Sequence, residues 1–186
     1  MRVFDELDIS RSDFSLETFE LLPTKAKLIL FTVLHELAKK KSIYLIDIVR
    51  FWEEDFYSCN SPIESIFMMA FNIVSILREK ELNDDDYGVS IFPQHEIQIE
   101  KKKYYADFFI WIQNSESDIS VLVECDGHDF HEKTKEQVEK DNEREYELKM
   151  AGYEILRFSG SQIYNNPFKC ANDVYDYLIL KEKRLG

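Results

Sequence analysis

Residues 104–131 read YYADFFIWIQNSESDISVLVECDGHDFH and contain two strand-like segments joined by a polar turn. The first segment, Tyr104–Gln113, is rich in aromatic and β-branched residues, and the second, Ile119–Cys125, is almost wholly apolar. The intervening Asn114–Asp118 consists of residues that favour turns. This stretch therefore predicts a β-hairpin made of two core strands.

Both predicted strands carry carboxylates despite their apolar character. Asp107 interrupts the first strand, Glu124 lies near the end of the second, and Asp126 follows two residues later. Because side chains alternate along a strand, Glu124 and Asp126 should point to one face and Cys125 to the other. Antiparallel pairing would place Asp107 next to Glu124, where like charges repel unless a cation lies between them. The pattern therefore predicts a Mg²⁺ site, since Mg²⁺ binds carboxylates, water and substrate phosphate oxygens.

The composition is that of a globular chain with a strong negative charge. The 186 residues are 45% hydrophobic and 32% charged, and the formal net charge is −13. This length fits one domain with a helical extension, and we expect an N-terminal helical segment over residues 1–60 before the main domain at 61–186. The charge counts against non-specific nucleic-acid binding, because phosphate contacts need local positive charge.

The cysteines and the apolar runs indicate a cytoplasmic protein. Cys59, Cys125 and Cys170 are odd in number and scattered, which argues against a disulfide framework and favours a reducing compartment. The first ten residues lack the basic and apolar regions of a signal peptide. The longest apolar run, Ile66–Leu77, is too short to span a bilayer, so we expect no membrane association.

Helical patterns dominate the first part of the chain. Ser61 followed by Pro62 and Glu64 is a helix start, with Ser61 as N-cap and Glu64 as the capping-box glutamate. We expect that helix to continue to about Leu82 and to be largely buried. Three earlier helices are expected at residues 15–22, 24–41 and 43–56.

From Tyr87 the hydrophobic period changes to two, which predicts strands. Two short strands are expected on either side of Pro93, and the order after the first helices is expected to be ββββαβα. The expected elements are strands at Val89–Phe92, Glu96–Glu100, Tyr104–Gln113, Ile119–Cys125 and Tyr153–Phe158, helices at His131–Met150 and Pro167–Lys183, and turns at Lys101–Lys103 and Ser159–Ser161.

Four motifs in this order resemble the DUF559 family. They are Tyr105–Phe108 (YADF), Val123–His128 (VECDGH), His131 and Gly152–Phe158 (GYEILRF). That family is similar to the very-short-patch-repair endonucleases within the PD-(D/E)xK nuclease superfamily. The resemblance covers roughly residues 61–174 and implies an α/β (α+β) fold, with a restriction endonuclease-like mixed sheet flanked by helices.

The resemblance also implies roles for individual acids. Asp107 resembles the first metal-binding aspartate, and Glu124 resembles the second acid of the signature. Asp126 stands where the broad superfamily places a lysine. Glu64 resembles an acid that many such nucleases supply from their first core helix. The cofactor implied is Mg²⁺ or Mn²⁺.

Basic residues complete the implied site. His131 resembles a histidine that the patch-repair enzymes use near the scissile phosphate, and His128 is a possible supporting residue. Lys135 is a candidate for the missing signature lysine. The family commonly has arginine where Tyr105 stands, which removes a positive charge here. Lys101, Lys102 and Lys103 form a basic run that is expected to be either a solvated turn or a phosphate contact. Arg144 and Arg157 are expected to form ion pairs with the acidic helices.

These observations favour a metal-dependent nuclease that hydrolyses phosphodiester bonds, with DNA as the expected substrate. The alternative is a catalytically silent nuclease-fold scaffold that acts with a protein partner or as a homodimer through residues 1–60; the net charge of −13 motivates it. A structural zinc site from His128, His131 and Cys125 is disfavoured, because strand alternation turns Cys125 away from the acids.

Overall fold

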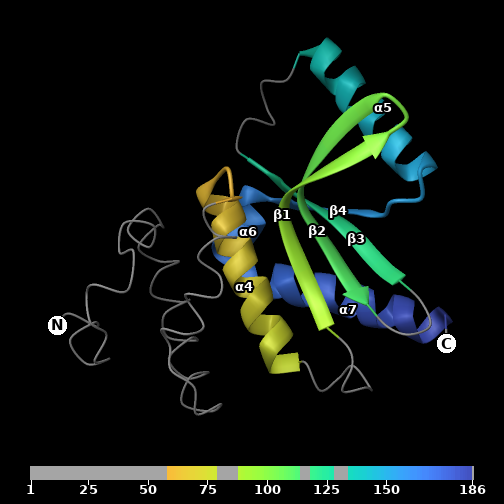
Figure 1. Ribbon diagram of the computed structural model, residues 1–186. Helices are drawn as coiled ribbons and strands as arrows, with labels where there is room; N and C mark the ends of the chain where they lie inside the picture. The colour runs from red at the N-terminus through yellow and green to blue at the C-terminus, as the bar shows by residue number, and fades with distance from the viewer. Residues whose placement is uncertain (1–57, 79–87, 114–117, 128–133, 186) are drawn as a thin grey trace.

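The computed structural model describes residues 58–78, 88–113, 118–127 and 134–185 (Figure 1). The predicted helices before residue 57, and His128 and His131, lie outside these ranges. Within these ranges no helix combines the length and the apolar character needed to cross a bilayer. The elements in order are α4 (Pro62–Arg78), β1 (Gly88–Ile99), β2 (Lys102–Gln113), β3 (Asp118–Asp126), α5 (Lys135–Met150), β4 (Ile155–Ser159), α6 (Gly160–Asn165) and α7 (Pro167–Leu185).

The four strands form one mixed sheet in the order β1-β2-β3-β4. The β1–β2 and β2–β3 pairs are antiparallel, whereas β3 and β4 are parallel and are connected through α5. The predicted hairpin is confirmed, with Phe108 opposite Val123 and Ile112 opposite Ile119. Helices flank this sheet, so the predicted mixed sheet with flanking helices is also confirmed.

The first strand differs from the prediction of two short strands around Pro93. β1 runs without interruption from Gly88 to Ile99 and pairs with β2 on both sides of Gln94, so the prediction of four strands before α5 is wrong. Pro93 is tolerated because β1 is the edge strand, where a missing N–H need not remove a ladder hydrogen bond. Gln94, the next residue, has a φ of 49°, which lies in the left-handed region.

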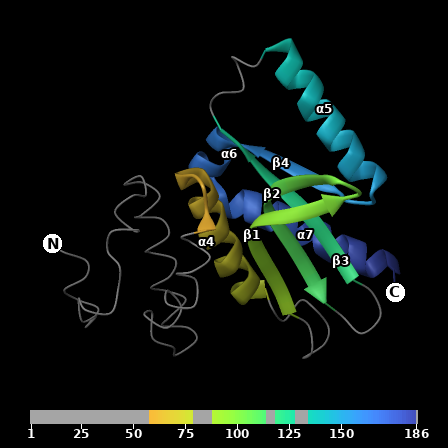
Figure 2. The same ribbon diagram turned by 45° about the horizontal axis from the view of Figure 1, so that its top comes forward.

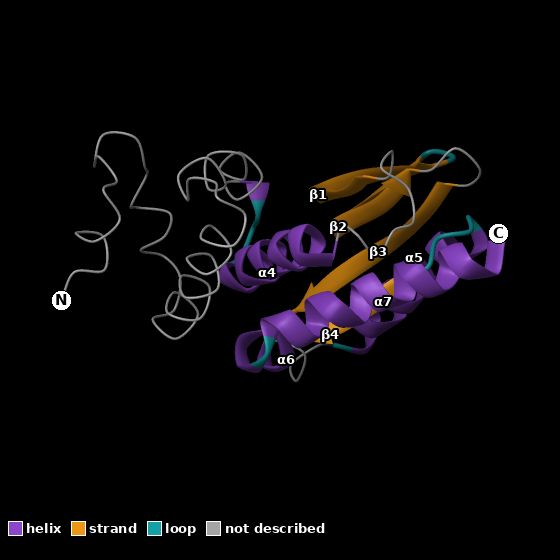
Figure 3. Ribbon diagram, turned by 90° about the horizontal axis from the view of Figure 1, so that it is seen from below, coloured by secondary structure: helices purple, strands orange, loops and turns teal. Residues whose placement is uncertain are grey.

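Three helices cover one part of the sheet and α5 covers another. Phe67 of α4 packs on Phe108 of β2 and Phe158 of β4, and Phe71 packs on Tyr175 of α7. Figure 1 and Figure 2 both place α5 apart from α4, beside the end of the β1–β2 hairpin. Figure 3 shows strands β1–β3 on one side and α7 on the other. A smaller cluster made of Ile97, Ala106, Leu122 and Leu148 joins α5 to the sheet.

Capping side chains explain where the helices begin. The Ser61 hydroxyl accepts from the Glu64 N–H at 3.2 Å, as predicted for an N-cap. α5 begins at Lys135 rather than at His131, because Thr134 forms a capping box there with Gln137. A second capping box, from Ser159 to Gln162, starts the short helix α6 where only a turn was expected.

Candidate active site

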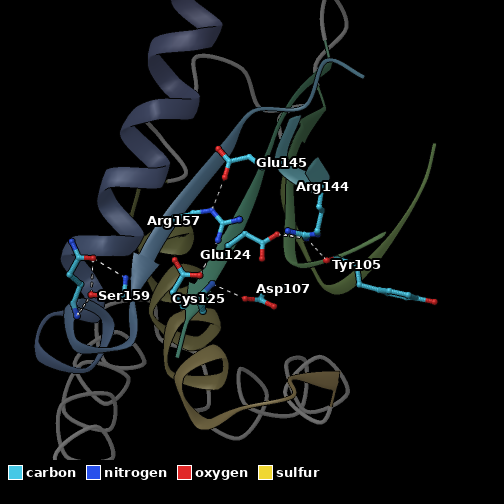
Figure 4. Close-up of polar contacts among 10 residues, drawn as sticks. Tyr105, Asp107, Glu124, Cys125, Arg144, Glu145, Arg157 and Ser159 are labelled. Carbon is cyan, nitrogen blue, oxygen red and sulfur yellow. Dashed lines mark hydrogen bonds and ion pairs between the residues drawn. The ribbon is translucent and has the colours of Figure 1, made fainter. Parts of the chain in front are cut away.

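Asp107 lies on β2 beside the end of β3 (Figure 4). Its Oδ2 accepts a hydrogen bond of 2.7 Å from the backbone N–H of Cys125. Among the described residues its other oxygen, Oδ1, has no hydrogen-bond partner. Within the described ranges the carboxylate is therefore held through one of its two oxygens.

The environment of Asp107 raises the pKa of its carboxyl to about 7. Burial is the largest cause, because it penalises the charged form, and the nearby Glu124 and Glu64 carboxylates raise the pKa further. The Cys125 N–H and the Arg144 guanidinium act in the opposite direction but do not offset the burial. An acid in this setting favours either a proton or a bound cation.

Glu124 is buried and forms an ion pair with α5. Its Oε1 accepts from Arg144 Nη2 at 2.6 Å, and the same nitrogen donates to the carbonyl oxygen of Tyr105 at 2.6 Å. Figure 4 shows the Glu124 side chain directed toward Arg144. Among the described residues its Oε2 has no hydrogen-bond partner. Val123 and Cys125 pack in the α4–α7 cluster instead, so the predicted alternation along β3 is confirmed.

Asp126 is also paired with an arginine. Its Oδ1 accepts from Arg157 Nη1 of β4 at 3.0 Å. Arg157 Nε lies 3.4 Å from a Glu145 oxygen without forming a hydrogen bond. Arg144 and Arg157 are thus ion-pair partners, as predicted, but their partners include strand carboxylates as well as the acidic helix α5.

Glu64 contacts the start of α4, as predicted, but it does not form the predicted capping box, in which its side chain would accept from the Ser61 backbone N–H. Its oxygens accept from the Asn60 N–H and the Ser61 hydroxyl, both at 2.8 Å. Gln94 also donates to it at 2.8 Å, from the residue with positive φ on β1. The Gln94 bond was not predicted, and the only signal in the sequence was its position after Pro93. Glu64 lies close enough to raise the pKa of Asp107, but both of its oxygens already accept hydrogen bonds.

The predicted lysines lie mainly on the surface of the hairpin. Lys102 and Lys103 begin β2 rather than forming a turn, and they pair with Glu147 and Glu96. A hollow of about 920 Å³ between the hairpin and α5 is lined by Lys101 and Lys102 but by none of the predicted acids. Lys135 is exposed at the first turn of α5.

A divalent cation fits the chemistry of these residues only in part. Carboxylate oxygens are the ligands that Mg²⁺ and Mn²⁺ prefer, and Asp107 Oδ1 and Glu124 Oε2 are free of other partners within the described ranges. However, no three His, Cys, Asp or Glu side chains in the described part of the chain are grouped closely enough to hold a metal. Glu124 and Asp126 are paired with arginines instead.

The family comparison identifies the same core. The family model described as REase_MTES_1575, a restriction endonuclease-like family, matches residues 80–178, just over half of the chain. The chain belongs to this family. No curated protein and no solved structure matches.

The REase_MTES_1575 match bears on the residues of the site. It includes Asp107, Glu124 and Asp126, and also Arg144 and Arg157, while Glu64 precedes it. Membership confirms the predicted restriction endonuclease-like relationship. The resemblance to DUF559 and to the patch-repair endonucleases stays a prediction.

Proposed function

We propose that this REase_MTES_1575 protein is a Mg²⁺- or Mn²⁺-dependent endonuclease that hydrolyses phosphodiester bonds in DNA. The observation that carries the proposal is the neighbouring pair of acids, Asp107 and Glu124, at the end of β3 in a chain of restriction endonuclease-like family. Each acid has one engaged oxygen and one without a partner among the described residues. Such a pair is suited to bind one cation between two strands.

The roles of the acids follow from their contacts. Asp107 and Glu124 would hold the metal. Asp126 and Glu64 would contribute if they released their present hydrogen-bond partners and turned to the metal. A metal bound there would activate a water molecule and neutralise charge on the scissile phosphate. The Cys125 N–H keeps Asp107 Oδ2 in place, so Oδ1 is already directed when a ligand arrives. His131 would assist proton transfer, with His128 and Lys135 as supporting residues.

The charge of the protein shapes how DNA would bind. With a net charge of −13 the surface as a whole repels DNA, so binding would depend on the site cations and the bound metal. Of the three lysines of the hairpin, Lys102 and Lys103 are occupied by glutamates. Lys101 is left as the candidate phosphate contact. We therefore expect DNA affinity to be weak and to depend only shallowly on salt, because few phosphate contacts release few counterions.

Cleavage of plasmid DNA tests the proposal. Supercoiled and single-stranded DNA would be incubated with the full chain in Mg²⁺, Mn²⁺ or EDTA, comparing wild type with Asp107→Asn and Glu124→Gln. Asp173→Asn is the matched control, because Asp173 is an exposed aspartate on α7 that pairs only with Lys169 among the described residues. The proposal expects metal-dependent cutting that both site variants lose and the control keeps.

Two results of this experiment would count against the proposal. Cutting that persists undiminished in Asp107→Asn would show that the acids do not carry the activity. A folded wild-type protein that cuts no DNA under any of these conditions would contradict the proposal that it is a DNA endonuclease.

A second candidate function is a silent nuclease-fold scaffold that acts with a protein partner. The arginine pairing of Glu124 and Asp126 favours it, because a scaffold can neutralise strand-end acids internally and needs no metal. Calorimetric binding of Mn²⁺ that Asp107→Asn abolishes would argue against the scaffold. Absence of such binding, together with a specific partner captured by the full chain, would favour it.

A further inference from the structure

One nitrogen atom of Arg144 joins the two strands that carry the candidate acids. Arg144 Nη2 donates to Glu124 Oε1 on β3 and to the carbonyl oxygen of Tyr105 on β2, each at 2.6 Å. Tyr105 precedes Asp107 by two residues, so both contacts lie next to the acid pair. Figure 4 shows the arginine reaching both partners.

Both members of the ion pair are shielded from water. The Glu124 side chain is 11% exposed and the Arg144 side chain 21% exposed. A carboxylate this buried is held strongly by its partner, and losing the partner leaves an uncompensated charge. Glu124 therefore depends on Arg144 for its orientation much more than an exposed glutamate would.

The rest of α5 contributes little to holding Glu124. Leu148 is the only buried residue of this helix, and it packs one turn beyond Arg144. The remaining polar contacts of α5 with the hairpin join Glu143 and Glu147 to Lys102, which is exposed, and Glu147 to the Tyr104 hydroxyl, which donates to it. The Arg144 contacts are thus the direct link between α5 and the acid pair.

We propose that Arg144 is a positioning residue that holds the Glu124 carboxylate in place beside Asp107 for binding a divalent cation. This inference rests on the proposed function, since it concerns the same pair of acids.

A positioning role and a simple counter-charge role predict opposite effects on metal affinity. If Arg144 only neutralises charge, removing it leaves the acids unopposed, and a divalent cation should bind more tightly. If Arg144 positions Glu124, removing it releases the carboxylate, and the cation should bind more weakly. Loss of such an orienting partner typically weakens metal binding about 10–100-fold.

Calorimetric titration of the full chain with Mn²⁺ separates the two roles. The variants are Arg144→Met, which removes charge and donors, and Arg144→Lys, which keeps a charged donor able to bridge two oxygens. Arg78→Met is the matched control, because the Arg78 side chain is 19% exposed and pairs with Asp176 of α7 at the far end of α4. Each variant is first checked by circular dichroism, and Arg144→Gln replaces Arg144→Met if the latter does not fold.

The expected result is Mn²⁺ binding at least about tenfold weaker in Arg144→Met, substantial recovery in Arg144→Lys, and no change in Arg78→Met. Unchanged or tighter binding in Arg144→Met would overturn the positioning role while leaving the proposed function intact. A wild-type protein that binds no Mn²⁺ would overturn the proposed function and this inference together.

Discussion

Replacing Asp107 by asparagine should stabilise the fold at high pH, because the folded protein holds the aspartate in an unfavourable charged state. The pKa of this carboxyl is about 7 in the fold against an ordinary value of 3.8. A difference of this size corresponds to up to about 4 kcal/mol, at about 1.4 kcal/mol for each pH unit. Asparagine keeps the shape and an oxygen that can accept from the Cys125 N–H.

The sign of the pH dependence follows from the raised pKa. Below pH 3.8 both states carry the protonated acid, and Asp107 costs the fold nothing. Between pH 3.8 and about 7 the unfolded chain releases its proton while the folded chain keeps it, so the free energy of unfolding falls as the pH rises. Above about pH 7 the free energy of unfolding has lost the whole contribution that this pKa difference can remove. The gain from Asp107→Asn should therefore increase by about 2 kcal/mol between pH 5.5 and pH 8.

Urea denaturation followed by circular dichroism in EDTA measures this gain. Wild type, Asp107→Asn and the control Asp173→Asn would be unfolded at pH 5.5 and at pH 8. The control should stay within about 0.5 kcal/mol of wild type at both pH values, as expected for an exposed surface position. An Asp107→Asn gain that is equal at the two pH values, or a loss at pH 8, would refute the reasoning.

Three further predictions concern the metal, the start of α5 and its anchor. Mn²⁺ at a hundredfold excess over its dissociation constant should stabilise wild type by about 2.7 kcal/mol, and thermal melting should show no such shift in Asp107→Asn; equal shifts would contradict Asp107 as a ligand. Thr134→Ala removes the capping box of α5 and should lower the free energy of unfolding by about 1 kcal/mol in urea, whereas an unchanged midpoint would mean that the cap is not needed. Leu148→Ala should cost about 2–5 kcal/mol in the same measurement and reduce DNA cleavage, because it loosens the helix that carries Arg144. Met150→Ala, at an exposed position, is its control, and equal effects of the two would contradict the anchoring role.

The hairpin and its acids could be predicted because they depend on local patterns. Two runs of aromatic and β-branched residues flank a run of turn formers, so the two strands follow from local composition and the adjacency of Asp107 and Glu124 from their antiparallel pairing. The N-cap at Ser61 follows from side chains within a few residues of the helix start. The prediction that Pro93 separates two strands was wrong, because the cost of proline in a strand depends on whether that strand is at the edge of the sheet. Only the strand order shows that β1 is an edge strand.

The sequence by itself determined the central hairpin, the start of α4 and the acids that could bind a cation, because each depends on residues close together in the chain. The tertiary structure alone decided the partners of those acids. Arg144 meets Glu124 across 20 residues, and Arg157 meets Asp126 across 31. Gln94 reaches Glu64 across 30 residues through a backbone conformation unusual for glutamine. These contacts depend on how α5, β4 and β1 pack around β3, and no local pattern in the chain specifies that packing.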